Sequence, residues 1–163
     1  MTGLRGFTLV EGVVASAVLA IAVVALGASL SAGHMASYEF AQGRRATRLA
    51  EELLEYVLSL PYYDPDETSA PGPEVGEVDV RFFDNIDDFH GYVEAAGCLK
   101  DMAANDYPAE YQQFTRSVTV EAGAELLSGL GDPIPGLIVR VEVRSLRGGV
   151  WEVTRFVATP IGS

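Results

Sequence analysis

An uninterrupted stretch without formally charged side chains, residues 12–33, constrains this chain more than any other feature. At about 1.5 Å of rise per residue, about 20 apolar residues cross a bilayer core of about 30 Å. The stretch is rich in alanine and valine, and its small residues let membrane helices pack closely. Residues 7–33 are therefore predicted to form a membrane-spanning helix.

An acidic residue, Glu11, lies at the start of this stretch, after Leu9 and Val10. A charge at the centre of a membrane helix costs about 3 kcal/mol and costs less near the end, yet a plain anchor has no need of it. Such an acid suggests a function, with a cation from a neighbour as its partner. A secretory signal is another alternative, because Ser29-Leu30-Ser31-Ala32 loosely fits a small-residue cleavage site after the apolar stretch. The residues alone leave both alternatives open.

The segment Arg5-Gly6-Phe7-Thr8-Leu9-Val10-Glu11 resembles the processing site of type IV prepilins. The resemblance implies that prepilin peptidase cuts after Gly6, so that residues 1–6 are a leader and the new N-terminal Phe7 is N-methylated. It also implies that Glu11 attracts the amine of the adjacent subunit during filament assembly. Two features depart from the family: no proline lies between Met1 and Pro61, and Gly12 replaces the usual bulky aliphatic residue.

The same resemblance predicts a structural subunit, a minor pilin or pseudopilin, of a type IV pilus or a type II secretion filament. Its partners would be other pilin or pseudopilin subunits, prepilin peptidase, the inner-membrane assembly platform and, before assembly, membrane lipid. The chain would cross the inner membrane once with a periplasmic C-terminal domain, and would then enter a cell-surface pilus or a periplasmic pseudopilus. The alternative is a bitopic, membrane-anchored acidic binding module that does not polymerise.

Residues 34–61 continue the helical pattern as an amphipathic segment. Gly43 is a candidate site for a bend, and Pro61 is expected to end the helix. The helix would be about 80 Å long at 1.5 Å per residue, which makes sense if half of it packs outside its own domain. The apolar residues that recur at spacings of three and four are Phe40, Leu49, Leu53, Leu54, Val57 and Leu58.

Residues 62–163 are predicted to form a globular head on that helix. A segment rich in proline and glycine, residues 62–76, is followed by alternating apolar and polar residues. Alternation predicts strands with one buried face, as in an antiparallel sheet that a helix covers. The expected fold is α+β and pilin-like, with about four strands. The predicted strands lie at 78–82, 118–121, 139–144 and 151–157, with Gly148-Gly149 as the last turn.

An acidic segment, residues 84–92, falls between the first two predicted strands. Together with Leu-Pro-Tyr at residues 60–62, it is similar to minor pilin-like proteins related to the MSHA minor pilin MshD. Asp84, Asp87 and Asp88 are candidate Ca²⁺ ligands, because this ion prefers carboxylate oxygens. The spacing is not that of an EF-hand, and the pattern favours a polar turn whose Asp and Asn side chains bind backbone groups.

The overall charge limits the classes of function. Asp and Glu total 23 against 11 Lys and Arg, giving a formal net charge of −12, which argues against nucleic acid as a partner. The single cysteine, Cys98, excludes an intrachain disulfide. The sequence has two histidines, His34 and His90, and contains no Gly-x-Ser-x-Gly elbow and no phosphate-binding loop. We therefore expect neither an enzyme nor a cofactor.

Overall fold

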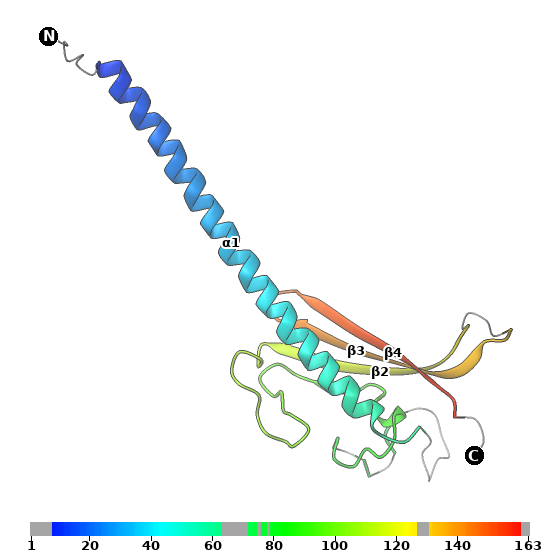
Figure 1. The fold of residues 1–163 in the computed structure, drawn as a ribbon. Coiled ribbons are helices and arrows are strands. Elements are labelled where there is room, and N and C mark those ends of the chain that lie inside the picture. Colours follow the sequence, from blue (N-terminus) through cyan, green and yellow to red (C-terminus); the bar gives the residue numbers. More distant parts are fainter. Residues whose placement is uncertain (1–7, 63–71, 75, 78, 127–130, 161–163) are drawn as a thin grey trace. The chain divides into compact units, whose positions relative to one another are not determined.

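The computed structural model describes residues 8–62, 72–74, 76–77, 79–126 and 131–160. The predicted leader and the processing residues Gly6 and Phe7 lie outside these ranges. The described chain has an α+β fold, in which a long N-terminal helix packs on a four-stranded antiparallel sheet, as predicted (Figure 1). Residues 43–163 form one compact unit and residues 1–42 form another. The elements are α1 (Leu9–Leu58), the short 3₁₀ helix η1 (Asp87–Phe89), β1 (Val93–Glu94), β2 (Phe114–Glu125), β3 (Ile134–Ser145) and β4 (Val150–Ala158).

Helix α1 continues through Gly43 without a break in its helical structure. Gly43 leaves room for an aromatic ring, because a Cβ atom there would lie 3.3 Å from Nε1 of Trp151. The helix ends just before Pro61, as predicted. In its last turn the N–H of Ser59 donates to the carbonyl of Tyr56 at 3.0 Å, a tighter pairing than that of an α-helix.

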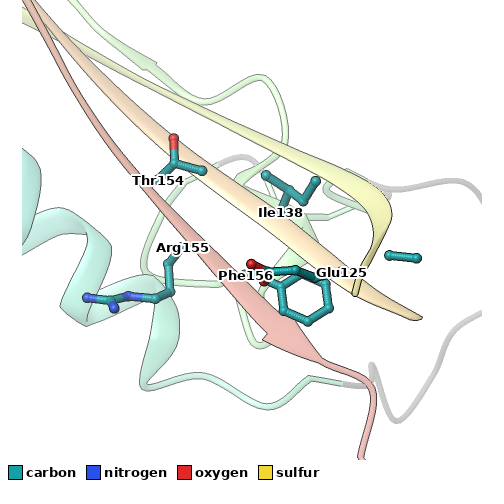
Figure 2. A pocket seen from close by; sticks show the side chains of 6 residues that line it. Glu125, Ile138, Thr154, Arg155 and Phe156 are labelled. Carbon is teal, nitrogen blue, oxygen red and sulfur yellow. The ribbon is translucent and has the colours of Figure 1, made fainter. Parts of the chain in front are cut away.

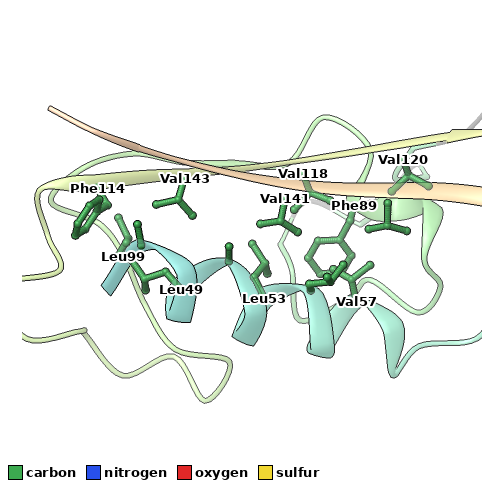
Figure 3. Close-up of a cluster of buried hydrophobic side chains, with 14 of the residues drawn as sticks. Leu49, Leu53, Val57, Phe89, Leu99, Phe114, Val118, Val120, Val141 and Val143 are labelled. Atoms are coloured by element: carbon green, nitrogen blue, oxygen red, sulfur yellow. The ribbon is translucent and has the colours of Figure 1, made fainter. Parts of the chain in front are cut away.

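The core lies between the second half of α1 and one face of the sheet (Figure 3). Burial of each large aliphatic side chain contributes about 1.5–3 kcal/mol relative to exposure. Phe40, which we expected in the same apolar stripe, is 69% exposed, because the buried apolar positions of α1 begin at Ala46. The buried residues of α1 are Ala46, Leu49, Ala50, Leu53, Leu54 and Val57, and those of the sheet include Phe114, Val118, Val120, Val139, Val141 and Val143.

The strands follow one another in the order β1-β2-β3-β4, each antiparallel to the next. Val118 pairs with Val141 and Val120 pairs with Val139, which brings four inward-facing valines together. Neighbouring positions along β2 are less buried, so the predicted alternation is present. A turn at residues 146–149 joins β3 to β4, and Gly148 adopts φ +95° there.

The first predicted strand, at 78–82, is wrong. Its described residues form a turn in which Oδ1 of Asp79 accepts hydrogen bonds from the backbone N–H and Nε of Arg81, at 3.1 and 3.0 Å. The N–H of Phe82 also donates to the carbonyl of Asp79 at 2.8 Å. These local bonds compete with strand pairing. The first strand of the sheet is β1, so the acidic segment 84–92 precedes the whole sheet.

A buried ion pair connects β1 to β2. Arg116 is fully buried, and its Nε donates to Oε2 of Glu94 at 2.8 Å while its Nη2 donates to the same oxygen at 2.5 Å. Nη2 also donates to the carbonyl of Lys100 at 2.7 Å, and the guanidinium lies 5.3 Å from the ring centroid of Tyr107. One charged pair therefore holds the loop after β1 against the sheet.

Candidate assembly site on the N-terminal helix

Helix α1 begins immediately after the predicted processing site, with Thr8 as its cap. Oγ1 of Thr8 accepts a hydrogen bond from the N–H of Glu11 at 3.3 Å, and the carbonyl of Thr8 accepts from the N–H of Gly12 at 3.1 Å. The pattern Thr-x-x-Glu is that of a capping box, and an acid in the first turn complements the helix dipole. The Glu11 side chain is exposed, so its carboxylate is accessible to a partner.

The apolar half of α1 is uncovered on every side. Leu9, Ile21 and Val24 are 85%, 70% and 72% exposed, and an 18-residue apolar window of the helix has no buried residue. Burying a large apolar side chain of this kind, in lipid or against protein, would be favourable by about 1.5–3 kcal/mol relative to its exposure to water. The chain thus has one N-terminal helix that is long and apolar enough to span a membrane, considering the residues that the structure describes.

The polar side chains near the start of this helix fit an apolar environment. Ser16 Oγ donates to the carbonyl of Gly12 at 2.8 Å, so its hydroxyl is satisfied within its own helix. Hydrocarbon demands internal hydrogen bonds, because no water is present to provide them. Glu11 is the exception, since a carboxylate needs a positive or hydrogen-bonding partner from outside the helix.

The acidic segment forms a backbone-binding turn, which confirms the prediction of a polar turn. Oδ2 of Asp88 accepts the N–H groups of Asp84 and Asn85 at 2.9 and 3.1 Å. Oδ1 of Asn85 accepts the N–H groups of Asp87 and Asp88 at 2.7 and 3.2 Å. The side chain of Asp87 accepts the N–H of Gly72 at 3.4 Å. These bonds position η1 at the edge of the core.

Within the described part of the chain, Asp88 is the only one of the three proposed Ca²⁺ ligands that lies in a cluster of carboxylates. Its neighbours are Glu74 and Glu77, and the carboxylate oxygens of the three residues lie within 4.8 Å of one another. Burial raises the pKa of Asp88, and the charges of Glu77 and Asp87 raise it further, against two backbone N–H donors that lower it. No sequence pattern pointed to this cluster, because Glu74 lies in the segment predicted to form turns and Glu77 lies between that segment and the strand expected at 78–82.

The described surface of the head includes two hollows large enough to consider as sites. One, of about 520 Å³, is lined by Ala124, Glu125, Ile138, Thr154, Arg155 and Phe156, with Arg155 directed away from Phe156 (Figure 2). The other, of about 540 Å³, adjoins β1 and includes Tyr92, Cys98 and Lys100. Burial raises the pKa of Tyr92 to about 12, so its phenol stays neutral at physiological pH. Neither set of lining residues contains a histidine that could serve as a general base.

Comparison with known proteins found no matching family model, no similar curated protein and no similar solved structure. The described residues define an α+β fold with one N-terminal helix that is long and apolar enough to span a membrane.

Proposed function

We propose that this chain is a filament subunit of the type IV pilin or pseudopilin class, which polymerises through its N-terminal helix. The observation that supports the proposal most is the uncovered apolar helix with an acid, Glu11, in its first turn. A plain anchor accounts for the apolar surface but not for the acid. The prepilin-like residues Gly6 and Phe7 immediately before the helix account for both features.

Helix capping alone does not account for Glu11. The hydrogen bond at the start of α1 uses the backbone N–H of Glu11 and the hydroxyl of Thr8, so the carboxylate takes no part in it. An acid in the first turn contributes about 0.3–1 kcal/mol through the helix dipole, whereas an unpaired charge in an apolar environment costs more. A helix designed only to cross a membrane would be more stable there with an uncharged residue.

The proposed mechanism depends on the unfavourable free energy of an unpaired Glu11 carboxylate in an apolar environment. Before assembly, the apolar helix lies in membrane lipid with Glu11 near one end. Cleavage after Gly6 creates a cationic amine on Phe7, and this amine pairs with Glu11 of the neighbouring subunit. Leaving either charge buried without its partner costs about 3–5 kcal/mol, so the axial register with both charges paired is strongly favoured over others. The acidic heads remain outside the helical core of the filament and stay hydrated.

The test compares Glu11→Ala with wild type in cells that assemble the filament. We expect the variant to resist extraction from membranes at high pH, as wild type does, and to be depleted from sheared filaments. Glu51→Gln is a matched control, because Glu51 is an exposed acid on the same helix, beyond the apolar stretch. Equal incorporation of Glu11→Ala and wild type would contradict the assembly role.

A second measurement separates this function from the non-polymerising alternative. Intact mass and N-terminal peptide analysis of the protein from its native membrane should show a chain that begins at methylated Phe7. A chain that begins at Met1 would support the membrane-anchored binding module instead. A chain that begins after Ala32 would show that the apolar stretch is a secretory signal.

A further inference from the structure

We propose that Glu74, Glu77 and Asp88 form a binding site for a hard divalent cation, with Ca²⁺ as the preferred ion. Their carboxylate oxygens lie within 4.8 Å of one another, which is close enough for a single ion to contact all three. Glu74 and Glu77 come from the segment before the 3₁₀ helix, and Asp88 comes from η1 itself. The site lies within the compact unit 43–163 and does not depend on the proposed filament function.

Asp88 supplies a second, independent observation. Its side chain has no exposed surface, and Oδ2 already accepts two backbone N–H groups. Its other oxygen, Oδ1, is buried and has no hydrogen-bond partner among the residues that the structure describes. An unsatisfied buried oxygen of this kind is rare in folded proteins and costs more when it carries charge. A cation bound between Asp88 and the two glutamates would satisfy it.

The local backbone holds the two glutamates in position. The N–H of Glu77 donates to the carbonyl of Glu74 at 3.1 Å, and the N–H of Glu74 donates to Oε2 of Glu77 at 3.0 Å. The carboxylate oxygens of both glutamates lie within 4.8 Å of an oxygen of Asp88 in η1. The two N–H donors on Asp88 likewise fix the orientation of its carboxylate. The ligands are therefore largely arranged before an ion binds.

The donor chemistry selects the class of ion. All three side chains offer carboxylate oxygens, and the group includes no histidine nitrogen or cysteine sulfur, so zinc and copper are disfavoured. Mg²⁺ demands a near-ideal octahedron and releases its water reluctantly, whereas Ca²⁺ accepts six to eight oxygens in irregular geometry. Backbone carbonyls and water would complete the shell around Ca²⁺.

Binding would connect the loop before η1 to the core of the head. Phe89 follows Asp88, is fully buried, and contacts Tyr56 of α1 edge-on at a centroid distance of 6.0 Å. An ion that joins Glu74 and Glu77 to Asp88 would therefore stabilise the head, because it binds the folded chain and not the unfolded one. We expect the melting temperature to rise by several degrees at millimolar Ca²⁺.

The experiment uses the full chain in detergent micelles and follows thermal unfolding through Trp151, the single tryptophan. Chelator-treated protein is titrated with CaCl₂, with MgCl₂, and with KCl at matched ionic strength. Wild type should be stabilised by Ca²⁺, less by Mg²⁺, and not by KCl. Asp88→Asn and Glu77→Gln should lose the Ca²⁺ response. Glu110→Gln, which changes an exposed acid outside the cluster, should keep it.

Asp88→Asn has a second expected effect, and in the absence of Ca²⁺ it should exceed that of Glu110→Gln, which removes one negative charge outside the cluster. An asparagine can keep accepting the two backbone N–H groups and can donate its amide to the glutamates, so the variant without Ca²⁺ should melt above wild type. If Asp88→Asn fails to fold, the test of the site rests on the Ca²⁺ response of Glu77→Gln compared with that of Glu110→Gln. The absence of a Ca²⁺ response in wild type, or the same response in Glu77→Gln and Glu110→Gln, would overturn the site. A larger response to Mg²⁺ would overturn the preference for calcium.

Discussion

Replacing Glu94 by glutamine should destabilise the head strongly, because it leaves the guanidinium of Arg116 buried without its counter-charge. Arg116 is fully buried and Glu94 is 9% exposed. Removing one partner of a buried ion pair costs about 3–5 kcal/mol. Arg116 keeps its hydrogen bond to the carbonyl of Lys100 and its position over the ring of Tyr107. We therefore expect a loss in the lower part of that range, about 3 kcal/mol.

The assay is urea unfolding of the full chain in micelles, followed through the fluorescence of Trp151. This residue reports on the core, because its ring lies 6.0 Å from that of the buried Phe114. Asp79→Asn is the matched control, since it breaks an exposed ion pair with Arg81 and should cost far less. The double variant Glu94→Leu with Arg116→Leu should recover much of the loss, because neither charge is then buried. A cost for Glu94→Gln as small as that of Asp79→Asn would refute the reasoning.

Three further changes test other parts of the head by the same unfolding assay. Leu53→Ala, at a fully buried position of α1, should cost about 2–5 kcal/mol, and a cost below that range would mean that the helix packs loosely on the sheet. Gly136→Ala should cost about 1–3 kcal/mol of unfolding free energy, because its Cβ would lie 2.2 Å from the carbonyl oxygen of Val157. Gly131→Ala should be neutral, because no atom of the described residues lies within 4 Å of the added Cβ, and equal effects of the two changes would contradict the steric argument. The pKa of Tyr92 is raised to about 12, above its value in the unfolded chain, so the unfolded state loses its proton first and stability should fall as pH rises from about 10 to about 12. Tyr92→Phe should remove this part of the pH dependence, and an unchanged profile in the variant would assign it to other groups.

The sequence predicted the parts of the fold that local periodicity determines. The long helix follows from its apolar content and spacing, and β2, β3 and β4 follow from alternating valines such as Val139, Val141 and Val143. The strand expected at 78–82 failed because the side chain of Asp79 binds the backbone of Arg81, a competition that alternation does not reveal. β1 has two residues, too few for any periodic signal.

Polar contacts between residues far apart in the chain could not be predicted from the sequence. Arg116 occupies an inward position of β2, and its burial depends on Glu94, which is 22 residues away in the chain. The cluster at Asp88 likewise depends on how the segment with Glu74 and Glu77 returns to η1. Glu11 could be identified from the sequence alone. An acid next to a long apolar stretch is energetically unfavourable in a membrane, and this can be recognised without knowing the fold.

The order of the strands has a consequence for how the head folds. Strands β2, β3 and β4 follow one another as two consecutive hairpins, β2–β3 and β3–β4. Their contacts join residues that are close in sequence, so they can form early in folding. The buried face of α1 leaves the ribosome first, but its partners in β2 and β3 are synthesised much later. Docking of the helix closes the longest loop and should come after hairpin formation. Substitutions at paired valines such as Val118 and Val141 should therefore slow folding, whereas substitutions at Leu49 or Val57 should mainly accelerate unfolding.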